Sequence, residues 1–406
     1  MRISKKTIYA ILLNSFWVMV EIGACLRIND YILSSFLIVA LITFAYDAKR
    51  VINKYIYHEY SWIWSAFIGL SAISTLINQR FNGFHAIAVG LSLYFICLVF
   101  IANSESGQVF VVFRNFMIAL AIFTLIDYFF SLGIFDLLKA NSVFYSIDPK
   151  TNGIASLFEY RHYYGYFLIV GLIILSQYPI RNKIANFAIQ IIFIINIVFT
   201  YTRNTWLAAI IIFVLSLFKE HKFSRKNLTH FIQGLVVAIL IFLVCSVIGV
   251  NVLKNISVRL SSMIISLYSG NSVRSYTLRE GVRYVLLNWK KYFLLGGGNG
   301  FALAWLNENP AGIWGEWTAA IDIQYVTTFM DSGILGIILL AILIYKIVTS
   351  YFLLKDKDKN KNIMLLSMTT MFIVICFFEV IGGCSAMYVM WNLLIVSYEN
   401  KRDRLT

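Results

Sequence analysis

Residues 271–300 read NSVRSYTLREGVRYVLLNWKKYFLLGGGNG. They form the centre of a segment from Asn251 to Ala320, the one long part of this chain that is not mostly apolar. Four of the nine tryptophans and a cluster of arginines and lysines lie within this insert, and long apolar stretches lie on both sides of it. Connecting segments on a rigid frame carry function more often than the frame does. The insert is therefore the first place to look for a functional site.

The composition of the whole chain is that of an integral membrane protein. Of its 406 residues, 60% are hydrophobic and 13% are charged, whereas a soluble domain is nearer half apolar and a quarter charged. The five cysteines all lie in apolar runs, so neither a disulfide framework nor a zinc site is expected. The start, MRISKK, resembles a secretory signal, but Glu21 interrupts the apolar run that follows and a retained first helix is expected.

Apolar stretches long enough to cross a bilayer recur along the chain. They predict an all-α, polytopic membrane protein with about twelve spans, because a transmembrane helix needs roughly twenty apolar residues. The stretches lie at 8–26, 31–46, 60–78, 84–103, 109–132, 162–179, 184–200, 203–218, 231–250, 322–354, 363–381 and 383–398.

The insert divides the expected spans into two groups. Residues 1–250 hold spans one to nine with a shorter outer loop at 133–161, and residues 251–320 form the large outer loop with short amphipathic helices. Residues 321–406 hold the last three spans and a tail.

Lysines and arginines set the expected orientation. If the N-terminus lies in the cytoplasm, 19 of the 34 lysines and arginines fall in short cytoplasmic segments. This is the positive-inside pattern. Both termini are then cytoplasmic in an inner membrane, and both longer loops face outward. The net charge of +14 is mostly a topology signal, so no nucleic-acid partner is expected.

The insert contains the glycine cluster Gly296-Gly297-Gly298-Asn299-Gly300. A dinucleotide fingerprint would need a further glycine where Leu303 stands, so a helix stop and tight turn is predicted instead. The five histidines are scattered, with none in the insert, and no metal or cofactor is expected.

Three arginines share one setting on the outer face. Arg161 stands just before a span, Arg203 opens the span RNTWLAAIIIFVLSLF, and Arg274 lies in the first turn of an expected helix capped by Ser272. The apolar face of that helix comprises Val282, Val285, Leu286, Trp289 and Phe293. A cation at a helix N-terminus is unfavourable unless an anion binds there to the free N–H groups and the guanidinium. The three ends together predict a pocket for a diphosphate.

Each arginine also has a purely structural interpretation. Arg203 near a bilayer boundary is placed to reach lipid headgroups, and Arg161 stands beside a span, where interface arginines are common. Arg274 is also consistent with an ordinary surface charge, as Arg279 and Arg283 are through pairing with Glu280. The sequence leaves both interpretations open.

The acidic end of the insert supplies a candidate base. In a straight helix counted back from the cytoplasm, Asp331 lies near the outer boundary and Asp322 roughly 13 Å above it. There the carboxylate of Asp322 can accept a proton from a sugar hydroxyl, although capping the following helix explains this residue equally well. Candidates for sugar contacts are Trp305, Trp314, Trp317 and Glu316, with membrane-interface tryptophans as the alternative.

The chain resembles the superfamily of O-antigen polymerases and O-antigen ligases. Thr200-Tyr201-Thr202-Arg203 is similar to the family's Ser/Thr-x-Ser/Thr-Arg at the outer start of a span. Arg274, the helix after it and the glycine turn are similar to the arginine, tryptophan-bearing helix and Gly-x-Gly of the large outer loop. Asp331-Ser332-Gly333-Ile334-Leu335-Gly336 is similar to the acid-x-Gly-hydrophobic-x-Gly that opens the next span. The resemblance covers the second half of the chain, and the first half only by topology.

The resemblance implies a polymerase of lipid-linked oligosaccharide repeat units, without a metal, working on undecaprenyl-diphosphate-linked glycans. Arg203 and Arg274, and more loosely Arg161, would hold the diphosphate, and Asp322 would be the base. Ligases usually carry His-Asn where this chain has Asp322 and Ile323, which favours the polymerase branch. The product would be O-antigen, capsule or exopolysaccharide, and the need for a chain-length regulator is left open.

Two alternatives remain. One is an O-antigen ligase that passes the finished glycan to an outer acceptor. The other is a flippase or transporter, for which ionisable residues should line a path through the membrane. The candidates for that path are Glu21, Arg114, Asp127 and Glu379, but no internal repeat is visible.

Overall fold

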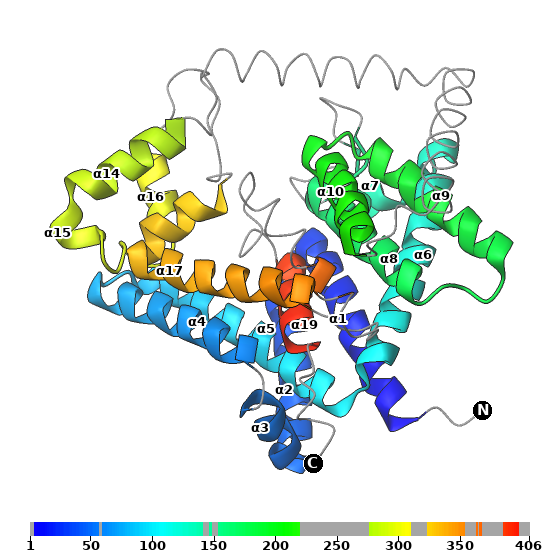
Figure 1. The fold of residues 1–406 in the computed structure, drawn as a ribbon, viewed down its shortest axis with the longest axis horizontal. Coiled ribbons are helices and arrows are strands. Elements are labelled where there is room, and N and C mark those ends of the chain that lie inside the picture. Colours follow the sequence, from blue (N-terminus) through cyan, green and yellow to red (C-terminus); the bar gives the residue numbers. More distant parts are fainter. Residues whose placement is uncertain are drawn as a thin grey trace. The chain divides into compact units, whose positions relative to one another are not determined.

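The computed structural model of the chain describes residues 4–56, 59–140, 146–147, 153–219, 276–309, 323–353, 363, 365–367 and 385–397. In these ranges the regular structure is helical, and the one β-type pairing is an isolated bridge between Ile147 and Ile154 (Figure 1). The expected all-α class is confirmed for this part of the chain.

Six of the described helices are long and apolar enough to cross a membrane. They are α1 (Lys5–Leu26), α2 (Asn29–Tyr46), α4 (Glu59–Ile77), α5 (Phe81–Asn103), α6 (Ser106–Phe130) and α17 (Gln324–Leu353). The other helices are α3 (Ala48–Ile56), α7 (Ile134–Leu138), α8 (Arg161–Gln177), α9 (Lys183–Phe199), α10 (Arg203–Lys219), η1 (Thr277–Gly281), α14 (Val282–Leu287), α15 (Trp289–Tyr292), α16 (Phe301–Glu308) and α19 (Ser385–Ser397). The expected span at 231–250 and most of the one at 363–381 lie outside the described residues.

The chain divides into two compact units. The first comprises Met1–Val20, Asp30–Val109 and Ser269–Thr406, and the second comprises Glu21–Asn29 and Phe110–Tyr268.

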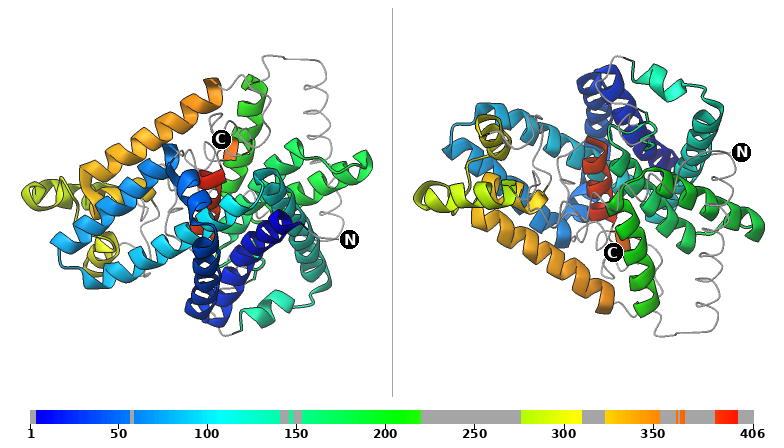
Figure 2. Two further views of the ribbon diagram at one scale, coloured as in Figure 1. Left: turned by 90° about the horizontal axis from the view of Figure 1, so that it is seen from below. Right: turned by 90° about the horizontal axis from the view of Figure 1, so that it is seen from above.

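In the first unit, α4 and α17 lie side by side and antiparallel (Figures 1 and 2). At one end of the pair, the Tyr60 hydroxyl bonds to Ser350 Oγ at 2.8 Å. At the other end, Ser74 Oγ donates to the Asp331 carbonyl at 3.1 Å. Polar side chains on apolar helices are thus used to join helices, as is common in membrane proteins.

The helix α17 is not straight. Gly333 has φ 66° and ψ −163°, which is outside the helical region and separates the first turns of α17 from the rest. A Cβ on Gly333 would lie 2.5 Å from the Leu294 carbonyl oxygen, so only glycine fits there. The prediction of one uninterrupted helix over 322–354 is therefore wrong, and the height of Asp322 counted along it does not hold.

In the second unit, α8 packs between α9 and α10. The Tyr164 hydroxyl bonds to Asn196 Oδ1 at 2.7 Å, and Asn196 Nδ2 donates to the Ala121 carbonyl at 3.2 Å. A buried asparagine therefore ties α6, α8 and α9 together, because its amide finds partners on the two neighbouring helices.

Candidate functional site

Two of the predicted arginines begin helices in the second unit. The helix α8 starts at Arg161 and α10 starts at Arg203, as the sequence indicated. The Tyr160 side chain at the N-cap of α8 makes no capping hydrogen bond. The first turn of α8 is therefore not closed by the usual side-chain cap.

The two arginine-bearing ends are neighbours. Gly165, one turn after Arg161, faces Thr205 of α10, and a Cβ on this glycine would lie 2.4 Å from Thr205 Oγ1. Thr205 stands two residues after Arg203 and is fully buried. Because glycine lets the two backbones approach closely, the first turns of α8 and α10 meet.

The side chain of Arg161 lies against the loop that precedes α8. A Cβ on Gly153 would lie 2.9 Å from Arg161 Nη1 and 2.6 Å from the Thr200 carbonyl oxygen. The next residue, Ile154, donates its backbone N–H to the Phe199 carbonyl at 2.9 Å. The structure thus brings Arg161 next to the turn that leads into Arg203.

That turn has an unusual backbone. Tyr201 has φ 47°, in the left-handed region that non-glycine residues seldom occupy, and its side chain is buried. Thr202 Oγ1 donates to the Thr200 carbonyl at 3.1 Å, which closes the turn locally. A strained conformation held by its surroundings is frequent at functional sites.

Two polar atoms beside this turn lack partners. Asn204 Nδ2 and Thr205 Oγ1 are buried and have no hydrogen-bond partner within the part of the chain that is described. Buried polar groups are nearly always hydrogen-bonded, so each exception needs an explanation. A polar ligand at the start of α10 would supply one.

A buried lysine holds the segment before Arg161. Lys139 Nζ donates to the Phe158 carbonyl at 2.5 Å, and the Glu159 N–H donates to Glu21 Oε2 at 3.3 Å. Burial lowers the pKa of Lys139 to about 8, while the charges of Cys25, Glu21, Asp136 and Glu159 act in the opposite direction. Burial also raises the pKa of Glu159, against the effect of Lys139.

This cluster was not predicted from the sequence. Glu21 was noted as a charge in an apolar run and as a candidate for a transport path, and Lys139 was not considered. Glu21 and Glu159 are 138 positions apart, and no local pattern joins residues so distant in the chain. A buried charge within an apolar run is the one signal that was present.

Three of the four ionisable residues considered for a transport path join helices to connecting segments. Glu21 accepts from Glu159, Asp127 Oδ1 accepts from the Ile134 N–H at 2.8 Å, and Arg114 donates to the Tyr178 carbonyl. These contacts give the three residues a local structural role. Glu379 lies outside the described residues.

Several predicted site residues also lie outside the described residues. They are Arg274, Trp314, Glu316, Trp317 and Asp322. Arg161 and the start of α10 are thus close together, whereas the side chain of Arg203 and all of Arg274 lie outside the described part of the chain. The pocket for a diphosphate stays a prediction.

Trp305 has a different place from the one expected. It is 4% exposed and belongs to a cluster of buried apolar residues in the first unit. Its ring lies 6.2 Å from that of Tyr276 and 6.1 Å from that of Tyr284. Because this ring is buried, it is not accessible to a sugar. Trp305 is therefore a core residue of the insert.

The expected apolar helix face is also divided. Val285 is fully buried, but Leu286 and Trp289 are exposed. The helix breaks at Asn288, where φ is −104° and ψ is 34°. Val285 and Leu286 differ within α14 itself, and Trp289 lies in α15 beyond the break, so these residues do not form one buried face.

The glycine cluster forms the tight turn that was predicted, and it docks on α17. Gly296, Gly298 and Gly300 all have positive φ. The carboxylate of Asp331 accepts from the N–H groups of Gly300 at 3.0 Å and Ala302 at 2.7 Å. Asp331 thus caps α16, a helix that starts 30 residues earlier.

The same turn is bonded to α4. Asn299 N–H donates to Thr75 Oγ1 at 2.9 Å, and Asn78 Nδ2 donates to the Gly296 carbonyl at 3.1 Å. The glycine turn and the Asp331-to-Gly336 motif, which are separate in the sequence, therefore form one structural element that contacts α4.

Comparison with known proteins does not identify the chain: no model of a known protein family matches it, and no curated protein sequence matches it.

Proposed function

We propose that this chain is a polytopic membrane glycosyltransferase that polymerises lipid-linked oligosaccharide repeat units. It would move a growing glycan from undecaprenyl diphosphate to the end sugar of another lipid-linked unit. One observation carries the proposal: the helices that begin with Arg161 and Arg203 meet at their first turns, beside buried polar atoms that lack partners.

This arrangement suits a diphosphate leaving group. The anomeric carbon–oxygen bond to the donor phosphate breaks, and a new bond forms to the acceptor hydroxyl oxygen. The departing undecaprenyl diphosphate keeps the electron pair, and the hydroxyl proton passes to a base, for which we propose Asp322. Guanidinium groups and helix N-termini stabilise the negative charge that develops on the phosphate oxygens. Arg274 would be the third cation.

The contacts within each unit agree with the orientation that the proposed topology of about twelve spans gives to the helix ends. Hydrogen bonds between elements join ends that the topology places on the same side of the membrane. Outer ends meet in the pairs Ser74–Asp331 and Phe199–Ile154. Inner ends meet in the pairs Tyr60–Ser350 and Thr7–Gln108. Both termini would be cytoplasmic and the site would face outward.

The test replaces Arg161 and Arg203 separately with alanine in the cell in which the gene is native. Each variant should lose about 100-fold or more of its activity, the typical cost of removing one charge-stabilising group. On a gel of surface polysaccharide, the ladder of long chains should collapse to single repeat units. Arg161→Lys keeps the charge but not the planar fork, and should recover only part of the ladder.

Arg279→Ala and Arg283→Ala are matched controls. Both arginines are exposed and paired with Glu280 at 2.7 Å and 3.8 Å, respectively. They should leave the ladder unchanged at equal protein level. A normal ladder in Arg161→Ala or Arg203→Ala would refute the mechanism, whereas long chains that stay on the lipid carrier would indicate a ligase.

A further inference from the structure

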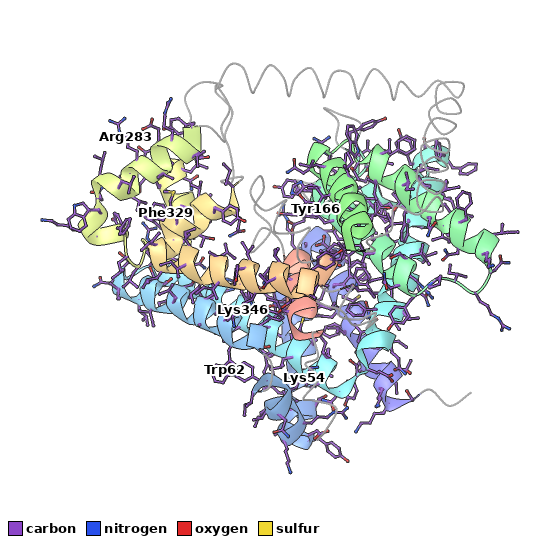
Figure 3. All side chains as sticks on the ribbon, viewed as in Figure 1. Lys54, Trp62, Tyr166, Arg283, Phe329 and Lys346 are labelled. Atoms are coloured by element: carbon purple, nitrogen blue, oxygen red, sulfur yellow. The ribbon has the colours of Figure 1, made fainter. Side chains whose placement is uncertain are left out.

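The corner between α14 and α15 exposes large apolar side chains. Leu286 is 50% exposed, Leu287 72%, Trp289 60% and Leu294 56%. We name these four residues the apolar corner. Figure 3 shows side chains of α15 projecting away from α4 and α17. Contiguous exposed apolar residues of this size mark an interaction surface.

Cations lie next to the apolar corner. Lys290 and Lys291 directly follow Trp289, and Arg279 and Arg283 lie on the preceding turns. Among the described residues of η1, α14 and α15, Glu280 is the one carboxylate, and it is paired with both arginines. The surface is therefore apolar and positively charged together, which fits an anionic lipid surface.

The apolar corner is fixed to a candidate membrane span. The backbone N–H of Ile334 donates to the Phe293 carbonyl at 2.8 Å, and that of Leu335 donates to the Leu294 carbonyl at 3.4 Å. From Ile334, the remaining helix to Tyr351 is roughly 27 Å long, close to the thickness of the hydrocarbon layer. Ile334 therefore marks the outer membrane boundary, and the apolar corner lies next to it.

We propose that the apolar corner rests in the headgroup layer of the outer leaflet, with Lys290 and Lys291 on anionic lipid phosphates. Tryptophan and lysine are the residues that favour this layer. The contact would hold the insert close to the membrane surface. The proposal rests on the proposed membrane topology but not on the proposed reaction.

A second copy of the chain fits this surface less well. Two such faces would bring like charges together, and the lysines would repel. An anionic bilayer would contact the leucines and the lysines at once, and on the proposed topology it lies beside α17.

The experiment places an environment-sensitive fluorophore on the full chain. Leu287→Cys is made in a chain whose five native cysteines are alanine, and the labelled protein is inserted as single copies into nanodiscs. Lipids carrying a nitroxide on the headgroup should quench this label strongly. The matched control is Asn307→Cys on the exposed side of α16, whose label should be quenched much less.

Anionic and neutral discs then test the lysines. Quenching at 287 should be stronger in discs of phosphatidylglycerol than in phosphatidylcholine, and Lys290→Gln with Lys291→Gln should remove the difference. Each lysine near an anionic surface contributes about fivefold to partitioning.

Equal quenching at 287 and 307 would overturn the proposal. Quenching at 287 that is the same in both lipids would overturn the role of the lysines. Protection of the 287 label only in discs holding two copies would assign the surface to a second copy and also overturn it. A failure of the Arg161 and Arg203 test would leave these outcomes unchanged, since no step here measures polysaccharide.

Discussion

Lys139 shows how one buried residue can position the candidate site. Its ammonium group contacts the Phe158 carbonyl, three residues before Arg161, and its side chain is almost fully buried. Burying a charged amine is costly unless partners compensate for the lost water. The surrounding carboxylates and the carbonyl compensate for part of that cost, and burial still lowers the pKa of Lys139. The charge and the position of the segment therefore depend on each other.

This dependence predicts a pH effect on stability. The pKa of Lys139 is lowered by burial from 10.5 to about 8, so between these values the unfolded chain binds more protons than the folded one. The free energy of unfolding contributed by Lys139 should therefore rise with pH from 8 to 10.5, and the burial penalty should be complete below pH 8. The effect is on the order of 2 kcal/mol. The thermal midpoint of the purified protein, measured between pH 7.5 and 10, checks it.

Lys139→Met should lose this rise, because it has no group to titrate. Lys290→Met, on the exposed surface of α15, is the matched control and should keep it. If wild type and Lys139→Met showed the same pH slope, the buried amine would have no part in it.

At the residue scale, the sequence predicted the residues that stand at the starts of helices. Arg161 and Arg203 were found because each stands where a polar turn meets an apolar run. Gly153 and Gly165 were missed, since their importance is the space that they leave for residues on other helices. Trp305 was predicted to lie at the surface for a similar reason. In a polar insert, no sequence feature distinguishes an aromatic residue at the surface from one in a small core.

At the element scale, the interlocked turn of Gly296–Gly300 and α17 sets the geometry of the insert. Asp331 provides its carboxylate to α16 and its carbonyl to Ser74 of α4. One residue at a helix break thus joins three helices, which explains an acidic residue followed by a glycine at this place.

Removing that carboxylate should destabilise the insert. Asp331→Ala leaves two backbone N–H groups at the start of α16 without acceptors, and we expect a loss of about 2–4 kcal/mol. The loss should appear as a lower thermal midpoint and faster proteolysis around residues 300–309. Asp331→Asn keeps one acceptor oxygen and should lose less.

Glu308→Ala, at the exposed end of α16, is the control for charge and should be near neutral. A catalytic role for Asp331 would give the reverse pattern: Asp331→Asn would be as stable as wild type but would make no long glycan. That result would contradict the structural role.

The elements themselves were predicted with mixed success. Long apolar helices are evident from composition, because nothing else places so many apolar residues in a row. The break at Gly333 was not foreseen, since a glycine inside an apolar run is also tolerated in a straight membrane helix. The contact of Gly333 with Leu294 distinguishes the broken helix from a straight one, and Leu294 lies 39 positions earlier in the chain.

At the scale of the molecule, each of the two units has its own internal contacts. Within each unit, hydrogen bonds join ends expected on one side of the membrane, such as Asn78 with Gly296 in the first and Glu21 with Glu159 in the second. Contacts of this kind fix the orientation of the helices within each unit. The proposed topology requires the expected outer ends of both units to face the same side of the membrane.

This requirement gives a test with four single cysteines in a chain whose native cysteines are alanine. Leu287→Cys and Leu137→Cys report the expected outer side of the first and second unit, and Tyr46→Cys and Arg181→Cys report the expected inner side. In intact cells, a membrane-impermeant maleimide should label only the two outer positions, and all four should react after permeabilisation. The positive-inside charge pattern is the reason to expect this orientation.

The pairing of the results separates the possible errors. If Leu287 and Tyr46 reacted on the same side, the assignment of α4 and α17 as antiparallel spans would be wrong. If both pairs were inverted, the arginine ends of α8 and α10 would face the cytoplasm, where the lipid-linked glycans of the proposed reaction are not presented. Opposite orientations of the two units would mean an even number of crossings between α10 and η1, instead of the one span proposed at 231–250. Labelling of the two outer positions alone would agree with the proposed topology, in which the insert and the arginine ends of α8 and α10 face outward.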